Sequence, residues 1–133
     1  MSRSRIKLFK CPVCETVVEV LEACGLELTC CGPAMVEVSD RPGEGTDVHG
    51  PVVRWEGKRM TLSTRGRHPM DDDHHIAWME VTGGGATYRR FFEPGQPAEW
   101  TVRVPAEQVT ARLYCTLHGL RTFVAERASA SVV

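Results

Sequence analysis

Several features that would point to a membrane, a nucleic acid or a nucleotide are missing from this sequence. No apolar run approaches the roughly 20 residues needed to span a bilayer. None follows the basic segment 1–7 either, so we expect no signal peptide and a cytoplasmic location. The net charge of −1 gives no support for a nucleic-acid partner or an acidic membrane surface. No Lys-Ser/Thr pair follows Gly83–Gly85, which excludes a phosphate-binding loop there.

The sequence also lacks internal repeats and a convincing pattern for a long helix. It contains instead a succession of short strand-like segments separated by Gly, Pro and Asp turns. With 133 residues the chain can form one domain, or a small domain with an appendage. We expect strands over residues 8–10, 17–21, 26–29, 35–38, 52–55, 59–62, 75–81, 87–92, 99–104, 109–115 and 120–124.

Composition divides these strands into two groups and predicts a mainly β protein. Residues 39–48 are polar and carry one proline and two glycines, which is typical of a linker. Residues 1–38 are too few to bury much core, so a metal cross-link would have to provide much of their stability. Residues 49–133 carry six or seven strands with recurrent turns, which favours an antiparallel, immunoglobulin-like β-sandwich.

Five of the six cysteines lie within the first 31 residues. Cys11 and Cys14 have the spacing of a metal-binding turn, and Cys30 and Cys31 are adjacent, which disfavours a disulfide between them. In a reducing cytosol this arrangement indicates four thiolates that hold zinc or a single iron. Cys24 has no partner spacing of its own, and we expect it to be a free thiol.

A second candidate site combines the remaining cysteine with histidines. Cys115 and His118 are three residues apart around a turn that follows a predicted strand, so both side chains can reach one metal ion. His49, His68 and His74 stand out with them among the five histidines of the chain. Four imidazoles and one thiolate are a ligand set typical of iron and too large for tetrahedral zinc.

Each of these residues also has a plainer interpretation. A lone histidine is more often a hydrogen-bonding residue, and we expect this of His75, because neighbours on a strand point to opposite faces. A lone Cys115 would more often be a buried core thiol. The run Asp71–Asp73 is more typical of a solvated turn than of a calcium site, which needs further oxygen ligands at set spacing.

The first group of cysteines resembles the desulforedoxin module. Cys11-x2-Cys14, followed by Cys30-Cys31-Gly-x-x-Met35, matches the pattern of that family. The resemblance implies one iron held by four sulfurs in a distorted tetrahedron, with a structural zinc at the same ligands as the alternative. The desulforedoxin module pairs with its own copy, so a homodimer is also implied.

Several segments of the remaining chain are similar, in the same order, to motifs of superoxide reductases. They are His49-Gly-Pro-Val52, His68-Pro-Met70 with His74 and Ile76-x-Trp78 after it, Phe92-Glu-Pro-Gly95, and Cys115-Thr-Leu-His118-Gly119. Together with the front module they identify the chain as resembling the desulfoferrodoxin family, the two-iron superoxide reductases.

The resemblance implies a specific site and reaction. His49, His68, His74 and His118 would be the equatorial ligands of a mononuclear iron, and Cys115 would be the axial ligand. The iron would give one electron to superoxide, hydrogen peroxide would leave, and a rubredoxin-like electron carrier would re-reduce the iron.

Three positions depart from the family's pattern. Val48 stands where the family usually has a lysine that faces superoxide, Asp47 carries a shorter carboxylate than the usual glutamate beside the iron, and Thr116 replaces an asparagine. The lost charge should slow capture of an anion. We hypothesise that a basic residue elsewhere compensates. The candidates are Arg54, Lys58, Arg65 and Arg67.

Two other functions are compatible with the sequence. The chain could be a redox- or metal-responsive binding protein that keeps the iron ligands with little turnover, which the valine at position 48 favours. It could also be a structural protein with zinc at the four cysteines and an empty sandwich. Retention of all five His/Cys ligands argues against that last interpretation.

Overall fold

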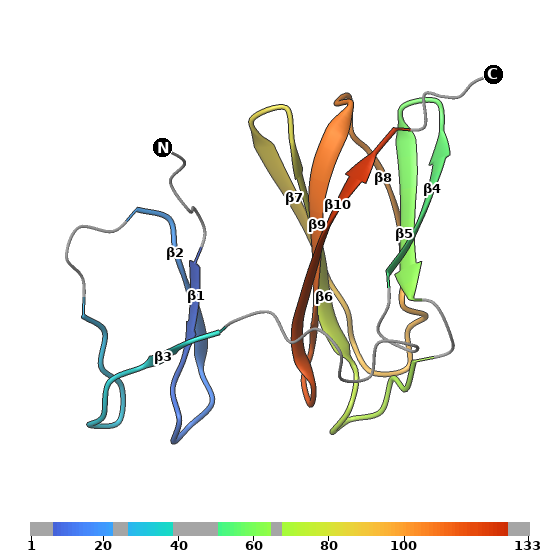
Figure 1. Cartoon of the computed structure of the whole chain (residues 1–133). Coiled ribbons are helices and arrows are strands. Elements are labelled where there is room, and N and C mark those ends of the chain that lie inside the picture. The colour runs from blue at the N-terminus through green and yellow to red at the C-terminus, as the bar shows by residue number, and fades with distance from the viewer. Residues whose placement is uncertain (1–6, 23–26, 39–50, 65–67, 128–133) are drawn as a thin grey trace. The chain divides into compact units, whose positions relative to one another are not determined.

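The structure is a computed structural model that describes residues 7–22, 27–38, 51–64 and 68–127 (Figure 1). The chain divides into two compact units, Met1–Ser39 and Asp40–Val133, and each is described below by itself. Over the described ranges, no helix is long and apolar enough to cross a membrane.

The first unit contains a small antiparallel sheet. Strand β1 (Lys7–Lys10) lies in its centre, between β2 (Val17–Val20) and β3 (Val36–Glu37). Among the described residues of this unit, only Leu8 and Cys11 are buried. The unit therefore has almost no hydrophobic core of its own.

The strand predicted over 26–29 is wrong for the residues that the structure describes. Residues 27–29 belong to no strand, and Thr29 makes a single isolated bridge to Ala34. The chain reverses direction between Thr29 and Ala34, and Cys30 N donates a hydrogen bond to Pro33 O within this turn. The third strand of this sheet is β3 instead.

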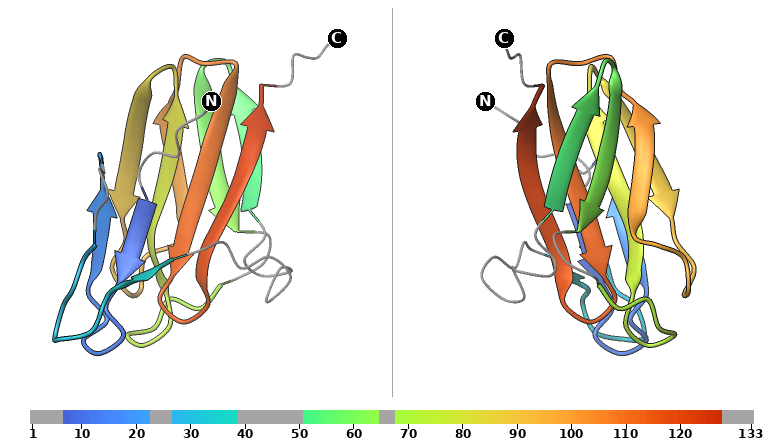
Figure 2. Two further views of the ribbon diagram at one scale, coloured as in Figure 1. Left: turned by 60° about the vertical axis from the view of Figure 1, so that its left-hand side comes forward. Right: turned by 90° about the vertical axis from the view of Figure 1, so that its right-hand side faces the viewer.

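The second unit is built from seven described strands in two antiparallel sheets (Figures 1 and 2). The four-stranded sheet has the order β10-β9-β6-β7 and the three-stranded sheet the order β4-β5-β8. The bounds are β4 (Pro51–Glu56), β5 (Arg59–Thr64), β6 (Ile76–Gly83), β7 (Ala86–Phe91), β8 (Glu99–Arg103), β9 (Gln108–Cys115) and β10 (Gly119–Glu126). The predicted mainly β fold with an antiparallel sandwich is thereby confirmed.

Glycine allows the tight turn between β6 and β7. Gly84 and Gly85 are the two residues between these strands, and both have positive φ, 62° and 81°. Two central residues with positive φ define the type I′ turn, whose twist matches that of the flanking strands. The glycine run is therefore a structural turn, as the sequence predicts.

The inward-facing side chains of both sheets form one core cluster, and all its members are at most 4% exposed. It comes mainly from alternate residues of β5, β6 and β9, as expected for a sheet with one face buried. The cluster consists of Met60, Leu62, Ile76, Met79, Val81, Phe92, Val104, Val109, Ala111, Leu113 and Cys115.

An irregularity in the pairing of β6 with β9 lies next to this core. Ile76 is opposite Cys115 and Trp78 is opposite Tyr114, so Ala77 is an extra residue, a β-bulge. The bulge shifts the alternation of β6, and Ile76 and Met79 are both fully buried in the core. With the bulge, Ile76 at the start of β6 pairs with Cys115 at the end of β9.

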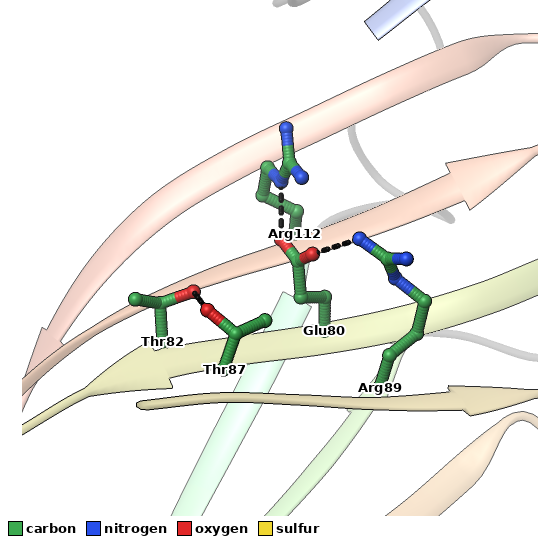
Figure 3. Close-up of polar contacts among 5 residues, drawn as sticks. All are labelled: Glu80, Thr82, Thr87, Arg89 and Arg112. Carbon is green, nitrogen blue, oxygen red and sulfur yellow. Dashed lines mark hydrogen bonds and ion pairs between the residues drawn. The ribbon is translucent and has the colours of Figure 1, made fainter. Parts of the chain in front are cut away.

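A buried carboxylate joins three strands on the other face of the four-stranded sheet (Figure 3). Glu80 of β6 is 1% exposed. Its Oε1 accepts a hydrogen bond from Arg112 Nε of β9 at 2.5 Å, and its Oε2 pairs with Arg89 of β7. Both guanidinium groups lie over the ring of Trp78, which stacks on Tyr114. These contacts fix the register of the strands that lead to the site described next.

Candidate metal centres

The four cysteine sulfurs of the first unit converge on one point. Cys11, Cys14, Cys30 and Cys31 offer sulfurs that all lie within 4.8 Å of one another. The Sγ atoms of Cys14 and Cys30 are 3.7 Å apart, and those of Cys30 and Cys31 are 3.9 Å apart. A metal with four sulfurs at about 2.3 Å in a tetrahedron separates them by about 3.8 Å. The spacing therefore fits a tetrahedral metal.

Local backbone geometry brings these sulfurs together. Cys31 has a φ of 57°, in the left-handed region that non-glycine residues seldom adopt, so its sulfur and that of Cys30 reach the same cluster. In the first turn, the N–H groups of Val13 and Cys14 each donate to Cys11 Sγ at 3.4 Å. Such bonds favour a thiolate.

The thiols titrate unequally when no metal is bound. The hydroxyl of Thr16, 3.1 Å from Cys14 Sγ, lowers the pKa of Cys14 to about 6. Hydrogen bonding with the sulfurs of Cys11 and then Cys14 raises the pKa of Cys30 to about 12. Four thiolates at this spacing repel one another strongly, and a bound cation would relieve that repulsion.

A second cluster is assembled in the sandwich from two separate segments. His68 and His74 precede β6, whereas Cys115 ends β9 and His118 lies in the turn to β10. Both segments lie at the same end of the sandwich (Figures 1 and 2). His68 is 5% exposed and Cys115 is fully buried.

The ligand atoms of this cluster are close enough to share a metal. Those of His68, His74 and Cys115 lie within 4.8 Å of one another. Cys115 Sγ is 3.4 Å from His68 Nε2 and 3.8 Å from His118 Nδ1. Metal bonds of about 2.3 Å to sulfur and about 2.1 Å to nitrogen give a sulfur-to-nitrogen distance of about 3.1 Å at a right angle and about 3.6 Å at a tetrahedral angle.

The three imidazole rings follow one another edge to face. The ring centroids of His68 and His74 are 4.9 Å apart with an interplanar angle of 76°, and those of His74 and His118 are 4.9 Å apart at 78°. His74 therefore lies between the other two.

Hydrogen bonds determine which atoms face the shared point. His68 Nδ1 donates to Pro69 O at 2.7 Å, which leaves Nε2 to face the sulfur. His118 instead presents Nδ1. The backbone N–H of His118 also donates to Cys115 Sγ at 3.4 Å, which ties the turn to the sulfur.

A pair of hydrogen bonds ties the two ligand-bearing segments together. Thr116 N donates to His75 O at 2.9 Å, and His75 N donates to the Thr116 hydroxyl at 3.1 Å. Asp71 O accepts from the ring Nδ1 of His75 at 2.8 Å and from the backbone N of His74 at 3.3 Å. Thr116 thus holds the turn with His74 against the turn that starts at Cys115.

His75 and the run Asp71–Asp73, for which the sequence favoured plainer interpretations, both lie among the described residues. His75 belongs to neither metal-binding group found among the described residues, and its ring contacts a backbone carbonyl instead. The exposed carboxylates of Asp71–Asp73 also form no such group within the same part of the chain.

Some residues singled out in the sequence cannot be placed in this geometry. His49, Asp47, Val48, Cys24, Arg65 and Arg67 lie outside the described residues. Two candidates for the compensating charge are described. Arg54 is exposed and pairs with Glu99 at 3.5 Å, and Lys58 is exposed in the turn between β4 and β5.

Two family models match the chain. The model described as desulfoferrodoxin matches residues 45–123, and the model of the desulfoferrodoxin N-terminal domain matches residues 4–38. The chain belongs to the desulfoferrodoxin family. The resemblance found in the sequence motifs is thereby confirmed.

Curated relatives support membership of the desulfoferrodoxin family over most of the chain. The desulfoferrodoxin homolog of Archaeoglobus fulgidus is 36% identical over 120 residues, which cover 86% of this chain and 94% of the relative. The desulfoferrodoxin of Nitratidesulfovibrio vulgaris is 35% identical over 119 residues, which cover 87% of this chain and 94% of the relative.

Solved structures support the same fold. The superoxide reductase of Treponema pallidum has a TM-score of 0.71 at 23% identity and covers 92% of this chain and 99% of its own. The superoxide reductase (neelaredoxin) of Ignicoccus hospitalis has a TM-score of 0.51 at 26% identity and covers 63% of this chain and 85% of its own.

Sequence reasoning about this desulfoferrodoxin-family chain missed three features near the second cluster. They are the bulge at Ala77, the hydrogen bonds between Thr116 and His75, and a buried arginine, Arg121. One signal could have indicated the bulge. The run Ile76-Ala77-Trp78-Met79 is apolar at every position and does not alternate as a regular half-buried strand would.

Proposed function

We propose that this desulfoferrodoxin-family chain is a superoxide reductase, which reduces superoxide by one electron to hydrogen peroxide at a mononuclear non-haem iron. The observation that carries the proposal is the convergence of three imidazoles on a buried cysteine sulfur. The likeness in fold to the Ignicoccus hospitalis protein, which is named a superoxide reductase, supports it.

Within this proposal the ligands have distinct roles. Cys115 would hold the iron through its buried sulfur, and His68, His74 and His118 would hold it through their imidazoles. His49 would be the fourth histidine ligand. Asp47 would supply a carboxylate outside this ligand set. When bound, iron at this site supplies one electron to superoxide, which takes up two protons and leaves as hydrogen peroxide.

The chain's own groups set the conditions for this chemistry. Neutral imidazoles with one thiolate leave a ferrous centre only weakly cationic. The N–H bond from His118 to Cys115 Sγ moderates the charge on that sulfur. The hydrogen bond from His68 Nδ1 to Pro69 O fixes the tautomer that can bind a metal.

The proposal also covers the division of the chain, the second metal, the electron donor and the oligomeric state. We assign residues 1–38 to a desulforedoxin-like module, 39–48 to a linker and 49–133 to the superoxide reductase domain. Cys11, Cys14, Cys30 and Cys31 hold a second metal, iron rather than zinc. A rubredoxin-like carrier supplies the electron, and two chains form a homodimer.

Metal analysis with optical spectra before and after mild oxidation tests the proposal. We expect two irons per chain and an oxidation-dependent thiolate-to-iron band beyond the spectrum of the four-cysteine centre. Pulses of superoxide should then oxidise the second iron within one turnover. Zinc alone, with no oxidisable iron after anaerobic reconstitution, would exclude the enzyme.

Two adjacent histidines offer a matched control. His74→Gln should remove a ligand and with it the thiolate-to-iron band. His75→Gln should keep that band, because the imidazole of His75 contacts a backbone carbonyl and not the metal-binding group. Equal loss in both variants would mean that the structure assigns the wrong histidine.

A redox- or metal-responsive binding protein is the second candidate. The valine at position 48 favours it, since the usual lysine is missing there. Rapid single-turnover oxidation by superoxide supports the enzyme, whereas a stable iron centre that superoxide oxidises only slowly supports the binding protein.

A further inference from the structure

One arginine of the second unit is buried and pairs with no carboxylate among the described residues. Arg121 of β10 is 5% exposed, and its Nη1 donates to Leu120 O at 3.4 Å. Over the described residues, its Nε and Nη2 atoms have no hydrogen-bond partner. A buried guanidinium is costly unless a negative charge lies near it.

Four other arginines of the second unit pair with a carboxylate. Arg89 and Arg112 share that of Glu80, Arg54 pairs with Glu99 and Arg127 pairs with Glu107. Arg121 has no such pair over the same ranges, although it is the most deeply buried of these cations. Its charge therefore needs a negative partner of another kind.

The strand register places Arg121 in the same layer as Cys115. Gly119 of β10 lies opposite Cys115 and Arg121 lies opposite Leu113. Residues directly opposite in a sheet point to the same face, and both Leu113 and Cys115 belong to the core. Phe123, two residues further on, also packs against the core, as the alternation requires.

The register also brings Arg121 close to Cys115 along the sheet. A residue and its diagonal neighbour on the adjacent strand are about 7–8 Å apart at Cα, and Arg121 is diagonal to Cys115 in the observed register. Gly119, which stands opposite Cys115, has no side chain to separate the two. The hydrogen bond from Nη1 to Leu120 O ties the guanidinium to the residue between Gly119 and Arg121.

We infer that Arg121 is a positioning residue, whose buried guanidinium supplies the positive charge that balances the Cys115 thiolate of the metal centre. The inference rests on the proposed iron site. A fixed cation beside the sulfur lowers the electron density that the thiolate gives to the metal. It therefore favours the reduced, less positive metal ion and opposes its oxidation.

The test compares three variants of the full-length, iron-loaded protein. Arg121→Met removes the charge at similar volume, Arg121→Lys keeps it, and Arg54→Met removes an exposed charge of the same unit. The redox midpoint of the His/Cys iron is followed through its thiolate-to-iron band. Arg121→Met should shift the equilibrium toward the oxidised iron by about tenfold or more, since charges at this distance interact appreciably inside a protein.

The band itself gives a second readout. Loss of the cation raises the energy of the sulfur electrons, so the band of Arg121→Met should move to longer wavelength. Arg121→Lys should stay near the parent protein, and Arg54→Met should match it in both measurements. An unchanged midpoint and an unchanged band in Arg121→Met would overturn the inference, as would equal shifts in Arg121→Met and Arg54→Met.

Two further measurements keep the outcome interpretable. Replacing a buried unpaired charge with a hydrophobic residue is often neutral or stabilising, so Arg121→Met should fold. If it does not, Arg121→Gln provides the neutral variant.

Cobalt(II)-loaded protein separates this inference from the proposed function. A shifted thiolate-to-cobalt band in Arg121→Met would support the Arg121–Cys115 pair even in a chain that does not reduce superoxide. A chain that reduces superoxide with an unshifted band would overturn the pair alone.

Discussion

The four-cysteine cluster and the His/Cys cluster differ in how their ligands are brought together. The first draws its ligands from one short stretch, between Cys11 and Cys31, held by local turns in a unit whose described residues include only two that are buried. The second draws them from segments between His68 and His118 that meet only because the sandwich places them at one end.

This difference predicts how each region depends on its metal. Folding of the first unit must be coupled to metal binding, because little apolar surface is buried there to offset the loss of chain entropy. In the sandwich, a hydrophobic core positions the ligands before any metal arrives. A comparison of the two regions without metal should therefore show the largest contrast.

Metal removal is expected to have the largest effect. Chelation at reducing conditions should unfold the first unit and leave the sandwich folded. Hydrogen exchange followed by mass spectrometry would show β1 losing protection while β9 keeps it. The variant Cys11→Ser should reproduce this loss, whereas Cys115→Ser should abolish only the thiolate band of the second centre. Protection of β1 that persists in metal-free protein would contradict the coupling.

Loss of the buried carboxylate should come next and should act on the sandwich alone. Glu80→Gln leaves Arg89 and Arg112 without their counter-charge, which should lower the free energy of unfolding by about 3–5 kcal/mol. Urea unfolding monitored by tryptophan fluorescence measures it. Glu99→Gln breaks the exposed pair with Arg54 and should cost less than about 1 kcal/mol. Similar losses in both variants would show that burial of the pair is unimportant.

Loss of the hydrogen bond between His75 and the Thr116 hydroxyl, which joins the two ligand-bearing segments, should have a smaller effect on stability. Thr116→Val removes the hydroxyl that accepts from His75 N, which should cost about 1–2 kcal/mol. The thiolate-to-iron band should also broaden, because the His74 turn is less firmly held against Cys115. Thr116→Ser keeps the hydroxyl and serves as the control. A valine variant with the parent's band and stability would show that the backbone bond from Thr116 N suffices.

The smallest change concerns reactivity rather than stability. In the folded turns of the first unit, the pKa of Cys14 is about 6 and that of Cys30 is about 12. A short iodoacetamide pulse directly after metal removal, before the unit unfolds, should therefore label Cys14 with a rate that rises through pH 6, while Cys30 stays nearly unlabelled. Site-resolved mass spectrometry measures both. Equal labelling of the two cysteines in the short pulse at pH 7 would contradict these shifts.

Much of the architecture could be predicted from local patterns. The hairpin of β4 and β5, the glycine turn after β6 and the strand that ends at Cys115 all follow from short alternating runs between turn residues. Residues 26–29 show the limit of this reasoning. Their composition favours a strand, but the reversal that brings Cys30 and Cys31 to the cluster prevents them from joining the sheet.

The pairing of Cys115 with His118 follows from their spacing, but the approach of His68 and His74 to them could be anticipated only through the family resemblance. Residues roughly 50 positions apart carry no local signal of contact, because nothing in their immediate neighbours determines where the strands between them lead. The side-chain atoms that face the centre are likewise decided by hydrogen bonds across the fold, such as that from His68 Nδ1.

The sequence by itself determined the four-cysteine turns, the strand and turn positions and the division of polar from apolar faces, since these depend on neighbouring residues and their preferred backbone angles. Only the tertiary structure decided the bulge at Ala77, the burial of Glu80 between two arginines, and the entry of Arg121 into the layer of Cys115. Each depends on strand register, and register is set by the packing of whole sheets rather than by any single segment.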